Sequence, residues 1–108
     1  MNILLLDDNL LTATRVKSSL EASGHSVALR RALPEDTEVL QAIVINLGSR
    51  SLKGLELVTS SRERFPGARL VGFCGHTEIE IRRAAKAAGM ERIFTNEEAL
   101  SGLQELKL

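Results

Sequence analysis

The amino-acid sequence predicts an α/β domain in which a five-stranded parallel sheet is covered by helices on both faces. Short apolar runs alternate with helical patterns along the chain, an order typical of parallel sheets. Two runs, Ile3–Leu6 and Ala42–Ile45, are continuously apolar, as expected for strands buried on both faces. We expect residues 1–108 to form a single domain, because this length supports one hydrophobic core.

Five segments are expected to be strands. Each is a short run of apolar or alternating residues that is bounded by glycine, proline or polar residues. In chain order they are Ile3–Leu6, His25–Leu29, Ala42–Ile45, Ala68–Phe73 and Arg92–Phe94.

Helical patterns separate these strands. The spacing of Leu10, Ala13, Val16 and Leu20 is that of one helix face, and Gly24 is a natural stop. Capping residues, prolines and glycines indicate where the other helices begin and end. The expected helices are Asn9–Ala22, a short second helix of one or two turns that starts near Pro34, Leu55–Phe65, a helix that Thr77 and Glu80 cap and Gly89 ends, and Glu97–Leu106.

The composition argues against several functions. Fourteen basic and fourteen acidic residues cancel, which disfavours nucleic acid or an anionic membrane as the partner. A single cysteine excludes an intramolecular disulfide and fits a reducing, cytoplasmic location. The N-terminus MNILLLDDN has no signal-peptide pattern, and no segment is long enough to span a bilayer.

Polar residues stand where four of the strands end. Asp7 and Asp8 follow the first strand, Asn46 the third, Cys74 the fourth and Asn96 the fifth. Because parallel strands carry their sites at their carboxyl ends, these side chains are expected to face one region. The acidic pair suits a hard cation such as Mg²⁺. The alternative is that an aspartate caps the first helix, although Asn9 can do so as well.

The order and spacing of these segments resemble the receiver domain of two-component response regulators, the CheY-like domain. The resemblance covers essentially the whole chain. It rests on ILLLDDN, on VINLGSRSLKG with Gly54 eight residues after Asn46, on LVGFCGHTE and on AAGMERIFTN. It implies a flavodoxin-like, doubly wound sheet with strand order 2-1-3-4-5.

The resemblance also implies a role for each position. Asp7 and Asp8 correspond to the Mg²⁺ pair of the family and Asn46 to its phosphorylated aspartate. Cys74 corresponds to the phosphate-sensing hydroxyl, Asn96 to the phosphate-binding lysine, and Ile93 to a ring that changes rotamer. Arg50 and Lys53 stand in a loop where proline and aspartate are frequent.

These departures predict a degenerate receiver that is not an enzyme. An amide cannot attack phosphorus as a carboxylate does, and Asn96 lacks the cation that would neutralise phosphoryl charge. The thiol of Cys74 is only a weak donor, and we expect it to be buried. No cofactor is required, and Mg²⁺ is expected to bind weakly at most. Arg50 or Lys53 either folds inward as a fixed positive charge or stays solvated, as loop charges usually do.

The expected partner is a protein, either a kinase or another signalling protein. Arg82, Arg83 and Lys86 form a basic stripe on the fourth helix, with Glu91 nearby. In the family, the face made by helix four, strand five and helix five often contacts partners or a second copy. A homodimer through this face is therefore a further expectation.

Three functions are weighed. The first is a stand-alone receiver-like domain that signals by protein–protein contact without aspartyl phosphorylation. The second is a working single-domain response regulator with unconventional Mg²⁺-dependent or phosphate-dependent switching. The third is a small nucleotide- or flavin-binding protein, which is disfavoured because no glycine-rich phosphate loop follows any strand.

Overall fold

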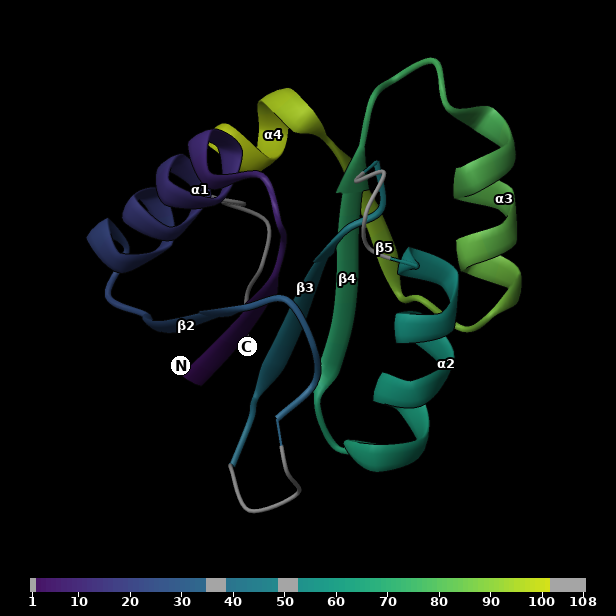
Figure 1. Ribbon diagram of the computed structural model, residues 1–108, viewed down its shortest axis with the longest axis horizontal. Coiled ribbons are helices and arrows are strands. Elements are labelled where there is room, and N and C mark those ends of the chain that lie inside the picture. The colour runs from purple at the N-terminus through teal and green to yellow at the C-terminus, as the bar shows by residue number, and fades with distance from the viewer. Residues whose placement is uncertain (1, 35–38, 49–52, 102–108) are drawn as a thin grey trace.

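A computed structural model describes residues 2–34, 39–48 and 53–101 of the chain. Its centre is a five-stranded sheet in the order β2-β1-β3-β4-β5, with every neighbouring pair parallel. This confirms the predicted doubly wound, flavodoxin-like topology (Figure 1). The strands are β1 Asn2–Leu6, β2 Ser26–Arg30, β3 Ala42–Asn46, β4 Arg69–Cys74 and β5 Arg92–Thr95.

The inner strands are buried along nearly their whole length. All five residues of β3 are buried, and β1 is exposed only at Asn2. Both strands have a neighbour on each side, so their backbone groups are paired and both of their faces need apolar side chains. The two continuously apolar runs in the sequence are therefore these central strands, as predicted.

Four helices lie within the described residues: α1 Leu10–Ala22, α2 Gly54–Arg64, α3 Ile79–Ala87 and α4 Asn96–Leu100. Asn9 caps α1, because its side chain accepts hydrogen bonds from the amides of Leu11 and Thr12. Gly24 has a φ of +95°, which suits the end of this helix. Thr95 and Glu98 form a capping box at the start of α4.

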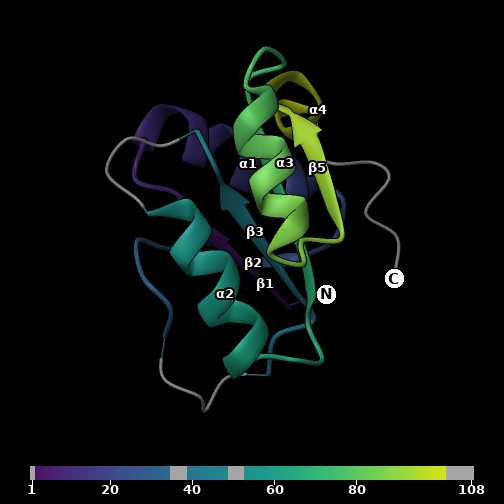
Figure 2. The same cartoon turned by 90° about the vertical axis from the view of Figure 1, so that its right-hand side faces the viewer.

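The sheet separates two cores. Alternate strand residues such as Ile3, Leu5 and Val44 pack with α1 and α4, whereas Leu4, Ile43 and their neighbours pack with α2 and α3. The helices accordingly cover opposite faces of the sheet in Figure 1, and Figure 2 shows α2 and α3 in front of the strands. Among the described residues, α1 and α4 cover one face of the sheet and α2 and α3 the other, so both faces carry helices as the alternation of the sequence indicates.

Some expected helix boundaries differ from the structure. Thr77 does not cap α3, because the helix begins at Ile79 after Glu78 and has no side-chain cap. Residues 31–34 and 39–41 contain no helix, and the rest of the expected short second helix lies outside the described residues. The last helix is described only to Leu100, so its expected extension to Leu106 also lies outside them.

One side chain joins α2 to the turn after α3. Arg62 donates a hydrogen bond from Nη1 to the carbonyl oxygen of Gly89 at 2.8 Å. Gly89 has a φ of +106°, and a side chain there would come within 2.6 Å of Arg62 Cδ. Glycine is therefore needed both for the backbone conformation and for the close approach of Arg62.

Replacing Gly72 by alanine is expected to lower the free energy of unfolding by about 1–3 kcal/mol, the usual cost of overpacking a core. The added methyl group would lie 2.7 Å from Met90 Sδ and 3.0 Å from the carbonyl oxygen of Ile45. Denaturant unfolding measures the loss. Gly67→Ala is the matched control, because no atom lies within 4 Å of its added methyl group. Equal stability of the two variants would contradict the packing described.

Candidate functional site

The carboxyl ends of β1, β3, β4 and β5 meet at one edge of the sheet, where doubly wound folds carry their sites. An open depression of about 520 Å³ lies at this edge. We call it the strand-end site. Its lining residues are Asn9, Thr12, Asn46, Gly48, Gly75, Thr77, Glu78, Asn96 and Leu100.

Asp7 is a buried carboxylate at this edge, only 2% exposed. Its Oδ1 accepts hydrogen bonds from the backbone amide of Asn9 and from Nδ2 of Asn46, both at 2.9 Å. The amides inside the first turn of α1 are bound by Asn9 and not by Asp7. Asp7 therefore orders the residues at the strand end, and the capping role belongs to Asn9.

Asn46 uses both polar atoms of its amide group. Nδ2 donates to Asp7, and Oδ1 accepts the backbone amide of Gly48 at 3.0 Å. The residue is 8% exposed, so water cannot readily take the place of either hydrogen-bond partner, and losing one of these bonds would be costly. The amide thus links β1, β3 and the loop after β3 in one network.

The second oxygen of Asp7, Oδ2, is buried and has no hydrogen-bond partner among the described residues. A buried oxygen of this kind is suited to a cation or an ordered water. Asp8 follows it and is partly buried, so these two carboxylates are the groups that would hold Mg²⁺. The third side chain, Asn46, turns its NH₂ group toward Asp7. The described part of the chain contains no cluster of three His, Cys, Asp or Glu residues able to hold a metal ion. These residues therefore fit a weak magnesium site better than a strong one.

Cys74 lies beneath the strand-end site and is fully buried. Burial raises the pKa of its thiol above the ordinary value of 9.0, opposed by the positive charge of Arg82 and assisted by the negative charge of Glu78. The thiol is therefore neutral at physiological pH and closed to solvent, as expected from the sequence.

The other two positions that the resemblance singles out have different surroundings. Asn96 is exposed and begins α4 at the rim of the strand-end site. Ile93 is buried on the α2–α3 side of the sheet. Between them, the carboxylate of Glu98 accepts the backbone amide of Thr95, and this hydrogen bond lowers the pKa of Glu98.

The loop after β3 is described at its two ends. Gly54 is buried, and a side chain there would lie 3.3 Å from Leu47 Cδ2 and 3.4 Å from Leu47 Cα. Glycine therefore lets the start of α2 lie directly against Leu47, the residue that follows β3. Lys53 is exposed, whereas Arg50 lies outside the described residues. The exposure of Lys53 agrees with the alternative in which this residue is solvated, and both alternatives stay predictions for Arg50.

Glu78 is a site residue for which the sequence pattern offered no signal. Its Oε2 accepts the backbone amide of Gly75 at 2.9 Å. The capping signature suggested by Thr77 and Glu80 drew attention to the neighbouring residues instead. Only the folded loop between β4 and α3 brings the carboxylate of Glu78 back toward the strand end.

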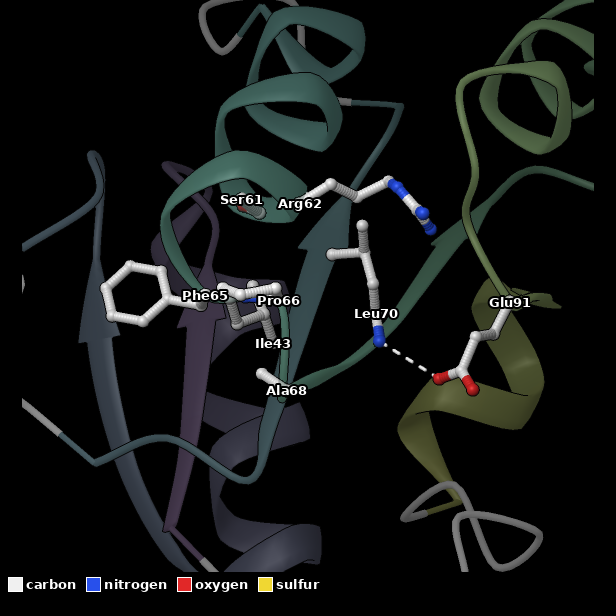
Figure 3. A pocket seen from close by; sticks show the side chains of 8 residues that line it. All are labelled: Ile43, Ser61, Arg62, Phe65, Pro66, Ala68, Leu70 and Glu91. Atoms are coloured by element: carbon white, nitrogen blue, oxygen red, sulfur yellow. Dashed lines mark hydrogen bonds between the residues drawn. The ribbon is translucent and has the colours of Figure 1, made fainter.

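The expected interaction face is divided by the structure. A shallow apolar hollow, which we call the α3 patch, is lined by Ile79, Arg82, Arg83, Lys86 and Ile93. Glu91 is not part of it, because this residue precedes β5 at the other end of the sheet. Figure 3 shows the carboxylate of Glu91 in a second hollow, where it accepts the amide of Leu70 at 3.1 Å. Glu91 also pairs with Arg69, so it is not available beside the basic residues of the patch.

Five parallel strands in the order 2-1-3-4-5, with helices on both faces, give this chain the fold of a CheY-like receiver domain. A receiver domain protein from Methanospirillum hungatei superposes with a TM-score of 0.78 at 19% identity, over 96% of this chain and 90% of that one. The chemotaxis response regulator CheY4 of Vibrio cholerae gives a TM-score of 0.78 at 20% identity, over 98% of both chains.

A third similar structure is a response regulator protein from Burkholderia pseudomallei with a phosphorylated aspartic acid, a calcium ion and citrate. It has a TM-score of 0.77 and 25% identity, over 95% of this chain and 66% of that one. No protein-family model and no curated protein sequence matches this chain. In the described ranges, no helix combines the length and apolarity needed to cross a membrane.

Replacing Asn46 by aspartate is expected to destabilise the chain by about 1–3 kcal/mol in the absence of Mg²⁺. The change removes a donor from buried Asp7 and places a second carboxylate beside it. Denaturant unfolding with and without Mg²⁺ measures the effect, and Mg²⁺ is expected to restore part of the loss. The matched control is Asn96→Asp, the same chemical change at an exposed position, the first residue of α4. If Asn46→Asp is as stable as this control without Mg²⁺, the Asp7–Asn46 hydrogen bond does not have the role described.

Proposed function

We propose that this chain is an atypical receiver domain that acts in signal transduction by protein–protein contact, without phosphoryl transfer to residue 46. The observation that carries the proposal is the amide of Asn46, held between Asp7 and Gly48. A phosphoacceptor needs a nucleophilic oxygen that can attack phosphorus. The position that corresponds to the acceptor instead carries a neutral group whose oxygen already accepts a backbone amide.

The surroundings of Asn46 support the same conclusion. Phosphoryl transfer depends on positive groups that neutralise the developing charge. Asn96 is neutral, and Cys74 is a buried thiol without a hydroxyl group. The similar structure from Burkholderia pseudomallei contains a phosphorylated aspartic acid, whereas the corresponding position of this chain is an asparagine. We therefore assign the chain no catalytic activity and no required cofactor, and we place it in the cytoplasm with its signalling partners.

The alternative function is a receiver that switches in an unconventional way through Mg²⁺ or through phosphate bound elsewhere. The observation in its favour is the buried oxygen Asp7 Oδ2, which has no hydrogen-bond partner among the residues that the structure describes and which a cation would complete. In this alternative, the acidic pair rather than residue 46 would receive the signal.

Incubation of the purified chain with acetyl phosphate and Mg²⁺, followed by intact mass measurement, separates the two functions. We expect no gain in mass, because residue 46 offers no attacking oxygen. A gain of one phosphate that persists in Asn46→Ala but is lost in Asp8→Ala would support the alternative. A gain that is accompanied by a conformational change in the unmodified chain would overturn the proposal.

The α3 patch is the surface we propose for the protein partner. Ile79 is 62% exposed there, and the exposed side chains of Arg83 and Lys86 give the rim a positive charge. An apolar centre with charged residues around it is typical of a protein interface. It fits a partner, a kinase or another signalling protein, that offers an apolar side chain flanked by acidic residues. If the occupant is a second copy of this chain, Glu97 and Glu98 of α4 supply the acidic residues, because Glu91 is paired with Arg69.

Charge reversal of Arg83 to glutamate is expected to reduce capture of the partner from the native host by about tenfold, the effect of roughly 1.4 kcal/mol. The matched control is Arg15→Glu, the same reversal on the exposed side of α1. Quantitative pull-down with tagged variants gives the comparison, and sedimentation of the purified chain tests for a second copy as the occupant. Equal loss in both variants, or no loss in either, would remove the α3 patch as the interface.

A further inference from the structure

The carboxylate of Glu78 lies between the loops that follow β3 and β4. Its Oε2 accepts the backbone amide of Gly75 at 2.9 Å. A side chain at Gly48 would place its first carbon 3.2 Å from this oxygen, and one at Gly75 would place it 3.5 Å away. Both loops therefore approach the same carboxylate, and both do so with a glycine.

The carboxylate of Glu78 lies on the same side of Gly48 as the amide oxygen of Asn46. The first side-chain carbon at Gly48 would lie 3.2 Å from Glu78 Oε2 and 3.5 Å from Asn46 Oδ1, so these two oxygens flank the same small space. Glu78 and Asn46 also line the same depression at the strand ends. A group attached to residue 46, or an anion bound next to it, would have to share this space with the carboxylate.

The charge at this position is suited to the backbone donor that it meets. A carboxylate that accepts a backbone amide makes a stronger hydrogen bond than a neutral acceptor does. Glu78 is only partly exposed, which strengthens its interactions relative to a solvated side chain. Arg82, one turn later on α3, lies near enough to affect the same thiol of Cys74 as Glu78 does.

We propose that the carboxylate of Glu78 keeps tetrahedral oxyanions such as phosphate out of the strand-end site. The same carboxylate holds the loop after β4 in one position through its hydrogen bond with Gly75. Asn46 carries no nucleophilic oxygen, whereas the Glu78 carboxylate places a negative charge on the same side of Gly48 as the amide oxygen of Asn46. The amide at residue 46 and the carboxylate of Glu78 are independent features, because the first lies on β3 and the second lies at the start of α3. This inference goes beyond the proposed function, since it states what occupies the site and which ligand is kept out.

Titration with inorganic phosphate, followed through the amide NMR signals of Gly48 and Gly75, tests the proposal. We expect the signals of the unmodified chain to shift without reaching saturation. In Glu78→Ala we expect saturable binding, with an affinity for phosphate at least about tenfold above the upper limit measured for the unmodified chain. Glu78→Gln is expected to be intermediate, because it keeps an acceptor for Gly75 but loses the charge. The matched control is Glu80→Ala, which removes the same charge from an exposed position two residues away.

Hydrogen exchange of the Gly75 amide is the second measurement. Its protection is expected to fall in Glu78→Ala and to be kept in Glu80→Ala. Equal phosphate affinity in Glu78→Ala and Glu80→Ala, or unchanged protection of Gly75 in Glu78→Ala, would overturn the proposal. The readout is noncovalent binding by variants, whereas the proposed function is tested by covalent mass gain of the unmodified chain. The two ideas can therefore fail separately.

Discussion

The hydrogen bond between Asn46 and Asp7 determines much of what this fold can do. A carboxylate as buried as Asp7 is costly unless donors surround it. The amide of Asn46 supplies one donor and the backbone of Asn9 supplies the other. An aspartate at residue 46 would have no proton to give, and the two acids would need a cation between them. The amide of Asn46 thus stabilises the strand end through a hydrogen bond that an ionised carboxylate could not donate.

The fold could be predicted from the sequence because burial leaves a clear pattern. Strands with a neighbour on each side, such as β1 and β3, must be apolar on both faces, and no other short element has this requirement. The topology followed from the resemblance and was confirmed strand by strand. Helix starts were less certain, because several adjacent polar residues can cap. Asn9 caps α1, as the sequence allowed. The predicted cap of α3 by Thr77 is wrong, because Glu78 precedes α3 and its carboxylate accepts the amide of Gly75.

Only the site residues that directly follow a strand could be predicted from the sequence. Asp7, Asn46 and Asn96 stand directly at strand ends, so their convergence follows from a parallel sheet. Glu78 and Glu91 depend on the path of loops, which has no periodic signature in sequence. Glu91 was expected beside the basic stripe because it is near in sequence, but the turn after α3 carries it to the other end of the sheet. Nearness along the chain was a poor guide because α3 runs antiparallel to the strand that follows it.

The hydrogen bond from Arg62 to Gly89 has a mechanical consequence. It fastens the end of α3 to the neighbouring helix α2 at the edge of the sheet that is far from the strand ends. The opposite end of α3 has no side-chain cap of its own, and Glu78 connects it to the backbone amide of Gly75. A protein that binds along α3 would therefore contact a helix whose two ends are connected to α2 and to the loop after β4, beside the strand-end site.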